Sequence, residues 1–151
     1  MPHGRWEAVD KVSDWLTRAG FPVRTQPTLE ASRRERELVV ELLEEEVAEL
    51  RAAVAASDIV EIADALGDIV WVTIEAALAF GIPIEEVFEE IHRSNLTKLQ
   101  GERRYTASGK LVGGTAYIPP DLSPILAAHG ASERDLDRRR RTSAAEDGSR
   151  A

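Results

Sequence analysis

The chain has 151 residues, a net charge of −8, 43% hydrophobic residues and 30% charged residues. That length allows one domain with a real core, and the composition is ordinary for a soluble globular protein. The lack of cysteine excludes disulfides and thiolate sites, and it fits the cytoplasmic location that we expect. The negative charge argues against nucleic acid as a partner. No apolar run approaches the ~18 residues of a membrane span, and the N-terminus lacks the apolar core of a secretory signal.

Glycine, proline and the spacing of apolar residues predict four main helices. Gly20 ends the first helix, and Ser57-Asp58 separates the second from the third. Gly81 and Pro83 separate the third from the fourth. The four segments span about residues 5–19, 28–56, 59–80 and 84–99.

After Gly101 the chain is rich in glycine and proline, which predicts a loop or short hairpin that packs on the helices. A short helix is expected over 122–128. From about Ser132 the residues are small or charged, which is typical of disorder. The sequence therefore predicts an all-α fold. Its first part, 1–131, is an antiparallel bundle of four main helices with a C-terminal loop or hairpin, and 132–151 is a disordered charged tail.

The second helix carries an acidic side chain on its apolar face. With about 100° per residue, Glu46 lies in the middle of that face, Glu49 at its edge and Glu45 slightly beyond. Glu44 lies on the opposite, solvent side. A carboxylate on an apolar face costs free energy unless a salt bridge, a shifted pKa or a metal ion compensates it. A salt bridge to an arginine on a neighbouring helix and a metal ion both remain open.

The third helix has an acidic stripe that spans roughly 60° and lies almost opposite its apolar residues. No lysine or arginine lies between Ala52 and Arg93, so these acids have no helical partner one turn away. A solvated acidic face is the simple alternative. Trp71 lies within the stripe, which suggests that this face is covered or receives an aromatic ligand. The stripe consists of Glu61, Asp64, Asp68 and Glu75.

Acids three or four residues apart project from the same side of a helix, so two packed helices can offer several oxygen ligands. The pairs are Glu46 with Glu49 and Asp64 with Asp68. Such a set suits Mg²⁺, with Mn²⁺ as a substitute. Zinc is disfavoured, because the three histidines are not at ligand spacing.

The fourth helix places Asn95 on its apolar side, flanked by His92 and Lys98. A buried asparagine needs hydrogen-bond partners, and capping of the helix end is one explanation. Lys98 could neutralise a phosphate. Lys110, in the glycine-rich segment, could close over a substrate, although a lysine in a surface turn is more often simply solvated.

Three motifs in this order resemble the all-α NTP pyrophosphatase superfamily, the MazG-like proteins. The segment Glu45–Glu49 reads as that superfamily's EExxE motif. Asp64–Val72 looks like its second acidic motif, and His92–Lys98 resembles the nucleotide-contacting segment that follows. The second motif is usually ExxD, but Ala65 stands three residues before Asp68. Asp64 or Glu61 would therefore replace the missing glutamate.

The resemblance implies Mg²⁺-dependent cleavage of nucleoside triphosphates between the α and β phosphates, with deoxynucleoside triphosphates in particular as substrates in nucleotide-pool sanitation. Glu46, Glu49 and Asp68 would hold the metal. Glu45 would orient the water or act as a further ligand. Asn95 and Lys98 would contact the phosphates.

The family's members are dimers or tetramers, so the resemblance also implies a homodimer or homotetramer. In such an assembly, a partner subunit could complete the acidic face. One alternative keeps the fold: phosphoribosyl-ATP pyrophosphohydrolase of histidine biosynthesis. Another is a non-catalytic helical protein whose acidic stripe binds a basic partner.

Overall fold

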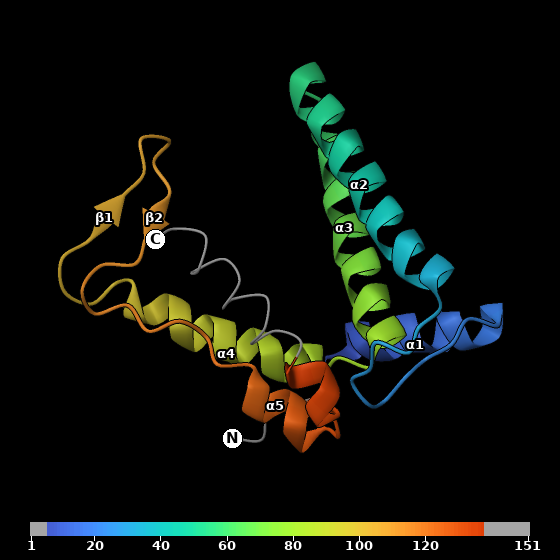
Figure 1. The fold of residues 1–151 in the computed structure, drawn as a ribbon. Coiled ribbons are helices and arrows are strands. Elements are labelled where there is room, and N and C mark those ends of the chain that lie inside the picture. The colour runs from blue at the N-terminus through green and yellow to red at the C-terminus, as the bar shows by residue number, and fades with distance from the viewer. Residues whose placement is uncertain (1–5, 138–151) are drawn as a thin grey trace.

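A computed structural model describes residues 6–137. The all-α class is confirmed: four long helices dominate, and a two-stranded hairpin and a short helix follow them (Figure 1). The elements are α1 (Glu7–Ala19), α2 (Arg33–Ala56), α3 (Ile59–Phe80), α4 (Ile84–Thr97), β1 (Arg104–Tyr105), β2 (Leu111–Val112) and α5 (Ser123–Ala128).

The helix α2 begins at Arg33, about five residues later than the sequence suggests. The reason is a capping box: Ser32 Oγ accepts a hydrogen bond from the Glu35 amide at 3.2 Å, and the Glu35 carboxylate accepts one from the Ser32 amide at 2.7 Å. Arg24 also pairs with Glu35 at 2.9 Å. These contacts fix the start of α2 against the loop that leads into it.

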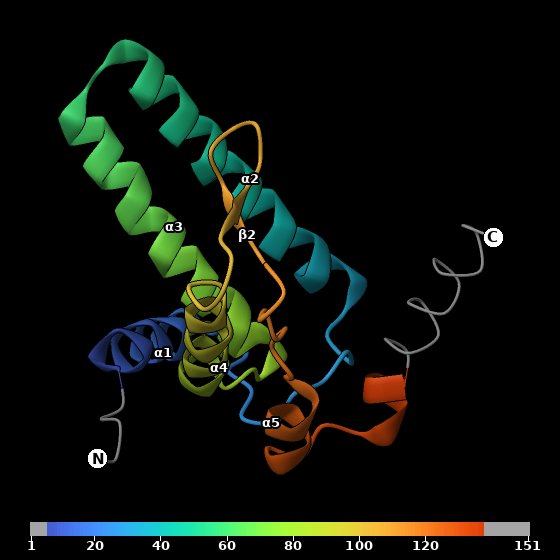
Figure 2. The same ribbon diagram turned by 90° about the vertical axis from the view of Figure 1, so that its left-hand side faces the viewer.

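The helices α2 and α3 lie side by side and antiparallel (Figures 1 and 2), because only two residues join them. Ser57 takes the left-handed conformation at φ 56°, and the Asp58 carboxylate accepts hydrogen bonds from the Val60 and Glu61 amides. This is the cap that the sequence predicts. Small or branched side chains lie buried in the two helices, among them Ala53, Ala65 and Val72.

The helix α1 packs across the C-terminal half of α3 and builds the main apolar core there. Val9, Val12 and Leu16 from α1 meet Ile74 from α3, and all four are 7% exposed or less. Burial of such side chains contributes roughly 1.5–3 kcal/mol each. The core therefore anchors one end of the α2–α3 pair.

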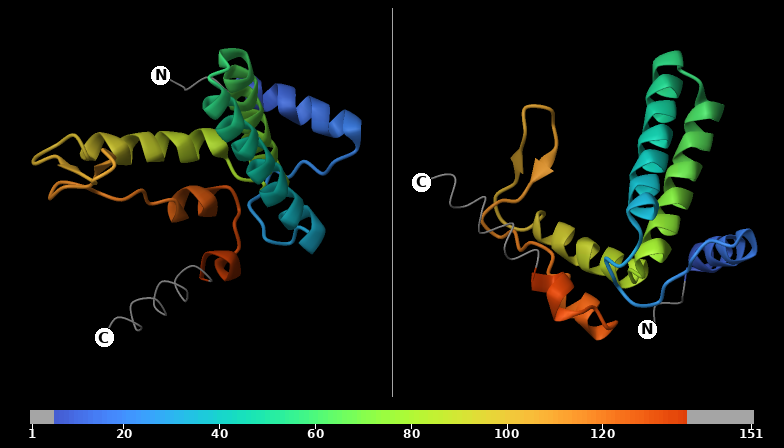
Figure 3. Two further views of the ribbon diagram at one scale, coloured as in Figure 1. Left: turned by 90° about the horizontal axis from the view of Figure 1, so that it is seen from above. Right: turned by 45° about the vertical axis from the view of Figure 1, so that its right-hand side comes forward.

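The helix α4 turns sharply away from α3, with a bend of 114° (Figure 3). Gly81 makes the turn possible, because its φ is +67° and a Cβ there would overlap the Gln26 backbone. Among the described residues, no single helix has the length and apolar composition to cross a membrane. The pair α3 and α4 meets that condition only jointly, across this bend. We call α4 with the β1–β2 hairpin the arm.

The segment after the hairpin runs back along α4 to α5 (Figures 1 and 3). The chain is helical again over 133–137, where we expected the tail to have begun. The physical reason is a cap: Ser132 Oγ accepts from the Asp135 amide at 3.2 Å, and Leu136 lines an apolar groove with Leu126 and Phe80. The rest of the predicted tail, 138–151, lies outside the described residues. The division into a domain and a tail stays a prediction.

Two apolar rows remain exposed on the α2–α3 pair. Ile59 is 74% exposed and Leu66 is 49% exposed, although both belong to the apolar face of the third helix. At 100° per residue, these rows lie on the face of the pair opposite the acidic side chains. The exposed members are Val40, Val47 and Val54 on α2 and Ile59, Leu66 and Val70 on α3.

Candidate active site

The α2–α3 pair brings the predicted acidic residues to one of its faces. In an antiparallel pair, side chains that lean to the same side of the contact line share one surface. Measured from the direction in which the two helices face each other, the acids of α2 and α3 occupy the same arc of the helical wheel. They therefore lie on the same side of the pair. From α2 come Glu45, Glu46 and Glu49, and from α3 come Asp64 and Asp68.

Glu46 is the member of this set that points most deeply between the helices. It is half-buried, and its Oε2 atom is enclosed without a hydrogen-bond partner among the described residues. Burial raises the pKa of Glu46, and the negative charges of neighbouring carboxylates raise it further. In order of size, those neighbours are Glu49, Asp68, Glu45 and Asp64. The five predicted acids therefore act on one another electrostatically.

These carboxylates fit a divalent cation by their chemistry. Within residues 6–137, the enclosed Glu46 oxygen has acidic neighbours and lacks the positive partner that burial of a charge requires. Hard oxygen donors are the ligands that Mg²⁺ prefers. In the structure of residues 6–137, no three His, Cys, Asp or Glu side chains already converge as a metal-binding group. Closure around an ion would need changes of side-chain rotamer.

Glu61 and Asp64 remain equal candidates for the position that departs from the usual second motif. Both line one surface hollow that Glu49 of α2 also lines. The hollow lies toward the α2–α3 turn, where Asp58 caps α3. Either carboxylate could therefore supply a further oxygen next to Glu49.

Asn95 and Lys98 lie at the far end of α4, beside the hairpin. The Lys98 ammonium donates to Asn95 Oδ1 at 2.7 Å and lies 5.4 Å from the centroid of the Tyr117 ring. Lys110 is exposed and adjoins the turn of the hairpin, near Gly109. Figures 1 and 3 show this end of the arm apart from the α2–α3 pair. One copy of the chain therefore does not bring the arm residues to the acids.

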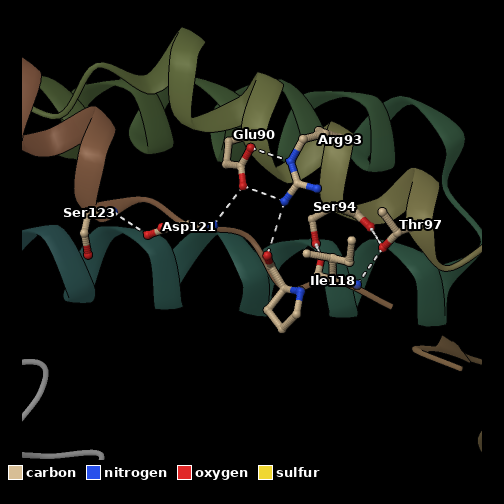
Figure 4. A network of polar contacts seen from close by, with 8 residues as sticks. Glu90, Arg93, Ser94, Thr97, Ile118, Asp121 and Ser123 are labelled. Carbon is tan, nitrogen blue, oxygen red and sulfur yellow. Dashed lines mark hydrogen bonds and ion pairs between the residues drawn. The ribbon is translucent and has the colours of Figure 1, made fainter. Parts of the chain in front are cut away.

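Two buried hydroxyl groups of α4 form hydrogen bonds with the segment that follows the hairpin (Figure 4). Ser94 Oγ donates to the Ile118 carbonyl at 2.9 Å, and the Ile118 amide donates to Thr97 Oγ1 at 2.9 Å. Thr97 Oγ1 in turn donates to the Ser94 carbonyl at 2.7 Å. Ser94 is 2% exposed and Thr97 is 7% exposed. Neither residue was predicted from the sequence, although two hydroxyls three residues apart on one side of a helix could have indicated a contact with another segment.

An ion pair extends the same network. Arg93 donates to Glu90 through two bonds of 2.7 Å and to the Pro119 carbonyl at 3.2 Å, while Glu90 accepts from the Asp121 amide at 2.8 Å. The bond from Arg93, followed by that from Asp121, lowers the pKa of Glu90 to about 2. Arg93, Ser94 and Thr97 thus hold the arm together, and Lys98 is half-buried. The expectation that Asn95 is buried was wrong: it is exposed, because the apolar side of α4 that carries it is itself exposed at Ile91 and Leu99.

Comparison with known proteins adds one finding. Residues 20–95 match the family model described as phosphoribosyl-ATP pyrophosphohydrolase. The chain belongs to this family. No curated protein matches the chain. The match covers half of the 151 residues and includes the whole α2–α3 pair with its acidic face.

Membership in the phosphoribosyl-ATP pyrophosphohydrolase family confirms the predicted all-α NTP pyrophosphatase superfamily, of which that family is a part. It also makes the chain a pyrophosphohydrolase that acts on nucleotide substrates. The match includes Trp71 and Asn95 and ends before Lys98 and the hairpin with Lys110. The matched segment thus contains all five acids, whereas Lys98 and Lys110 lie beyond its end.

Trp71 is covered by α1. A covered face is one of the two explanations that the sequence offers for a tryptophan in the acidic stripe, and contact with an aromatic ligand is the other. The Trp71 ring meets Trp15 edge-on at 5.8 Å, and Trp15 stacks on Phe21 at 6.2 Å. Trp71 also donates to Glu75, whose pKa is raised by partial burial. Packing accounts for Trp71, and its contact with a nucleotide stays a prediction. The half-buried state of Glu75 was not predicted.

Proposed function

We propose that this protein hydrolyses nucleoside triphosphates, deoxynucleoside triphosphates among them, to the monophosphate and pyrophosphate with Mg²⁺, in nucleotide-pool sanitation. The observation that carries the proposal is the enclosed Oε2 of Glu46, which has no hydrogen-bond partner in the described part of the chain and lies among four other carboxylates. A purely structural face would gain nothing from such an arrangement, because an unpaired buried charge is costly. A site that receives a cation with its substrate explains it.

Glu46, Glu49, Asp64 and Asp68 would hold the ion, and Mn²⁺ could replace Mg²⁺. A bound ion of this kind neutralises polyphosphate charge and lowers the pKa of a coordinated water. Glu45 is exposed at the edge of the same face, where its carboxylate can accept a hydrogen bond from the attacking water and orient it. Occupation of the site would also relieve the mutual repulsion of the carboxylates.

The proposed assembly is a homodimer or homotetramer in which the arm of one subunit serves the acidic face of another. Asn95, Lys98 and Lys110 carry the donors for phosphate, yet in one copy they lie away from the acids (Figure 1). The exposed apolar rows support self-association, since a set of large exposed apolar side chains on one face is typical of an interface. Trp71 remains a candidate for contact with the nucleotide at the base of the acidic face.

A mixing experiment tests the shared site. Glu46→Gln and Lys98→Met should each abolish most of the activity. In a dimer with the arm acting on its partner, a mixed dimer keeps one intact site, so an equal mixture should recover about a quarter of the wild-type rate. If the arm serves its own subunit, both sites of the mixed dimer are damaged and mixing restores nothing. Sedimentation of the wild type gives the number of subunits.

Phosphoribosyl-ATP is the second candidate substrate, because the matching family model carries that description. Both substrates contain the same triphosphate, and the acidic face alone does not distinguish them. The end of the arm, which lies outside the family match, supports a different nucleotide specificity. Release of pyrophosphate from a panel of nucleoside triphosphates, deoxynucleoside triphosphates and phosphoribosyl-ATP should rank a simple triphosphate first.

Preference for phosphoribosyl-ATP by more than tenfold in kcat/KM would overturn the proposed substrate but keep the site. No pyrophosphate from any member of the panel, with Mg²⁺ or Mn²⁺, would overturn both. The acidic face would then be better explained as a binding surface for a basic partner.

A further inference from the structure

The end of the arm holds a lysine between an amide and an aromatic ring. Lys98 Nζ donates to Asn95 Oδ1 at 2.7 Å and lies 5.4 Å from the centroid of the Tyr117 ring. This is within the range of a cation–π contact, which attracts an ammonium to the ring face. A lysine side chain is otherwise flexible, so two contacts from different segments restrict where its charge can go.

The backbone near Tyr117 is built to seat its ring. A Cβ at Gly113 would overlap the ring atoms of Tyr117, and a Cβ at Gly114 would overlap the Glu102 carbonyl. The Tyr117 amide also donates to the Gly114 carbonyl at 3.2 Å. The two glycines are therefore needed for close approach, which lets the ring fold back on its own loop.

The next residue fixes this loop to the helix that carries Lys98. Ile118 exchanges hydrogen bonds with Ser94 and Thr97, both of which are buried. The ring and the lysine thus belong to two segments that cannot slide past each other without breaking buried hydrogen bonds. An ammonium has three N–H donors, and Asn95 accepts one of them, so donors remain for an anionic ligand.

We propose that Tyr117 is a positioning residue for phosphate recognition: its ring, seated against Gly113, holds the Lys98 ammonium in place for a polyphosphate. The proposal rests on the proposed function in one respect, since it takes the ligand of Lys98 to be the polyphosphate of a nucleotide. It adds a residue and a contact that hold Lys98 in place before any ligand binds. It also explains the glycine at position 113, because a Cβ there would displace the Tyr117 ring.

The position of Lys98 can be measured without turnover. The chain has three lysines, Lys11, Lys98 and Lys110, so ¹³C-labelled lysine gives three Cε–Hε signals that Lys98→Arg can assign, and the ammonium keeps all its N–H donors. The Tyr117 ring current should shift the Lys98 signal away from the other two. Tyr117→Phe should keep the shift, because the ring remains. Tyr117→Leu should remove it, and so should Gly113→Ala, whose methyl displaces the ring.

Recognition of phosphate by Lys98 is tested by binding of inorganic pyrophosphate and by the kinetics of hydrolysis. Pyrophosphate should move the Lys98 signal of the wild type, and Tyr117→Leu should weaken that response about twofold to fivefold, the usual effect of an exposed cation–π contact. In hydrolysis, Tyr117→Leu should raise KM by a similar factor and leave kcat within about twofold. Tyr117→Phe should behave as the wild type. Tyr105→Leu is the matched control, because Tyr105 is the other tyrosine of the chain, lies in β1 and is 59% exposed.

Three results would overturn the proposal. The first is an unshifted Lys98 signal in the wild type. The second is a shift that survives in Tyr117→Leu and Gly113→Ala. The third is a Lys98 signal that pyrophosphate does not move. A wild type that releases no pyrophosphate from any nucleotide would refute the proposed function, whereas the two NMR measurements would still decide the role of Tyr117.

Discussion

Glu44 and Glu46 offer a matched test of the active site, because they are identical in chemistry and two residues apart on α2. Glu44 is exposed, whereas Glu46 is half-buried with Oε2 enclosed. Exchange to glutamine keeps the shape of each side chain and removes its charge. We expect Glu46→Gln to lose at least ~100-fold in kcat, equivalent to about 2.7 kcal/mol of transition-state stabilisation. Glu44→Gln should stay within about twofold, as exposed substitutions usually do.

The same pair of variants also separates a metal site from a salt bridge. Without metal, Glu46→Gln should melt at the wild-type temperature or above it, because it removes a charge that Glu49 and Asp68 repel. Its amide also gains donors for those carboxylates. With Mg²⁺, the rise in melting temperature should be smaller than in the wild type, since weaker binding gives less stabilisation. The measurements are melting in a chelator and in Mg²⁺, and pyrophosphate release.

Two outcomes would refute this reasoning. Equal, near-wild-type activity of the two variants would show that Glu46 is not in the site. A marked loss of stability of metal-free Glu46→Gln would indicate that the carboxylate neutralises a cation of the protein, because removal of one partner strands the other.

Three further predictions concern the framework. Trp71→Ala should destabilise the fold by about 3–5 kcal/mol in urea unfolding, since it empties the contact under α1; unchanged stability would contradict that packing role. Thr97→Val removes two hydrogen bonds at nearly constant shape, so it should cost about 1–3 kcal/mol and speed hydrogen exchange of the Ile118 amide, whereas unchanged exchange would exclude the Thr97 contact. Glu90 has a pKa of about 2 when folded against 4.5 unfolded, so the stability that it contributes is complete above pH 4.5 and is lost as pH falls toward 2. A plot of melting temperature against pH should fall less steeply in this window for Glu90→Gln, and an identical slope would contradict the Arg93 pair.

The helices and the acidic face could be predicted because both depend on local rules. Gly20, Gly81 and the Ser57-Asp58 pair end or start helices through backbone conformation and capping, which short sequence patterns report well. A two-residue connection forces α2 and α3 to lie antiparallel. Once that is known, the spacing of the acids on each helix places them on a common face.

The direction of α4 and the start of α2 depend on contacts between distant residues. The turn at Gly81 is set by how closely its backbone approaches Gln26, and no periodicity reports that approach. The capping box at Ser32 was present in the sequence, but the absence of Gly and Pro after Thr28 obscured it. The resemblance implies that Asn95 and Lys98 contact the phosphates of a nucleotide held at the acids, and therefore lie near them. The 114° bend puts them elsewhere in a single chain.

Periodicity reports that a helix face is apolar, but it does not report what covers that face. On α3, Ile59 and Leu66 form a regular apolar row, yet the buried residues are Ala65 and Val72 instead. Small side chains let two helices approach closely, and the larger ones are displaced to the outer side. Together with Val47 on α2, they form the face opposite the acids. In the proposed assembly, a second copy that covers this face would bury these side chains. The arm, which the bend at Gly81 directs away from the α2–α3 pair, would then bring Lys98 to the acids of another subunit.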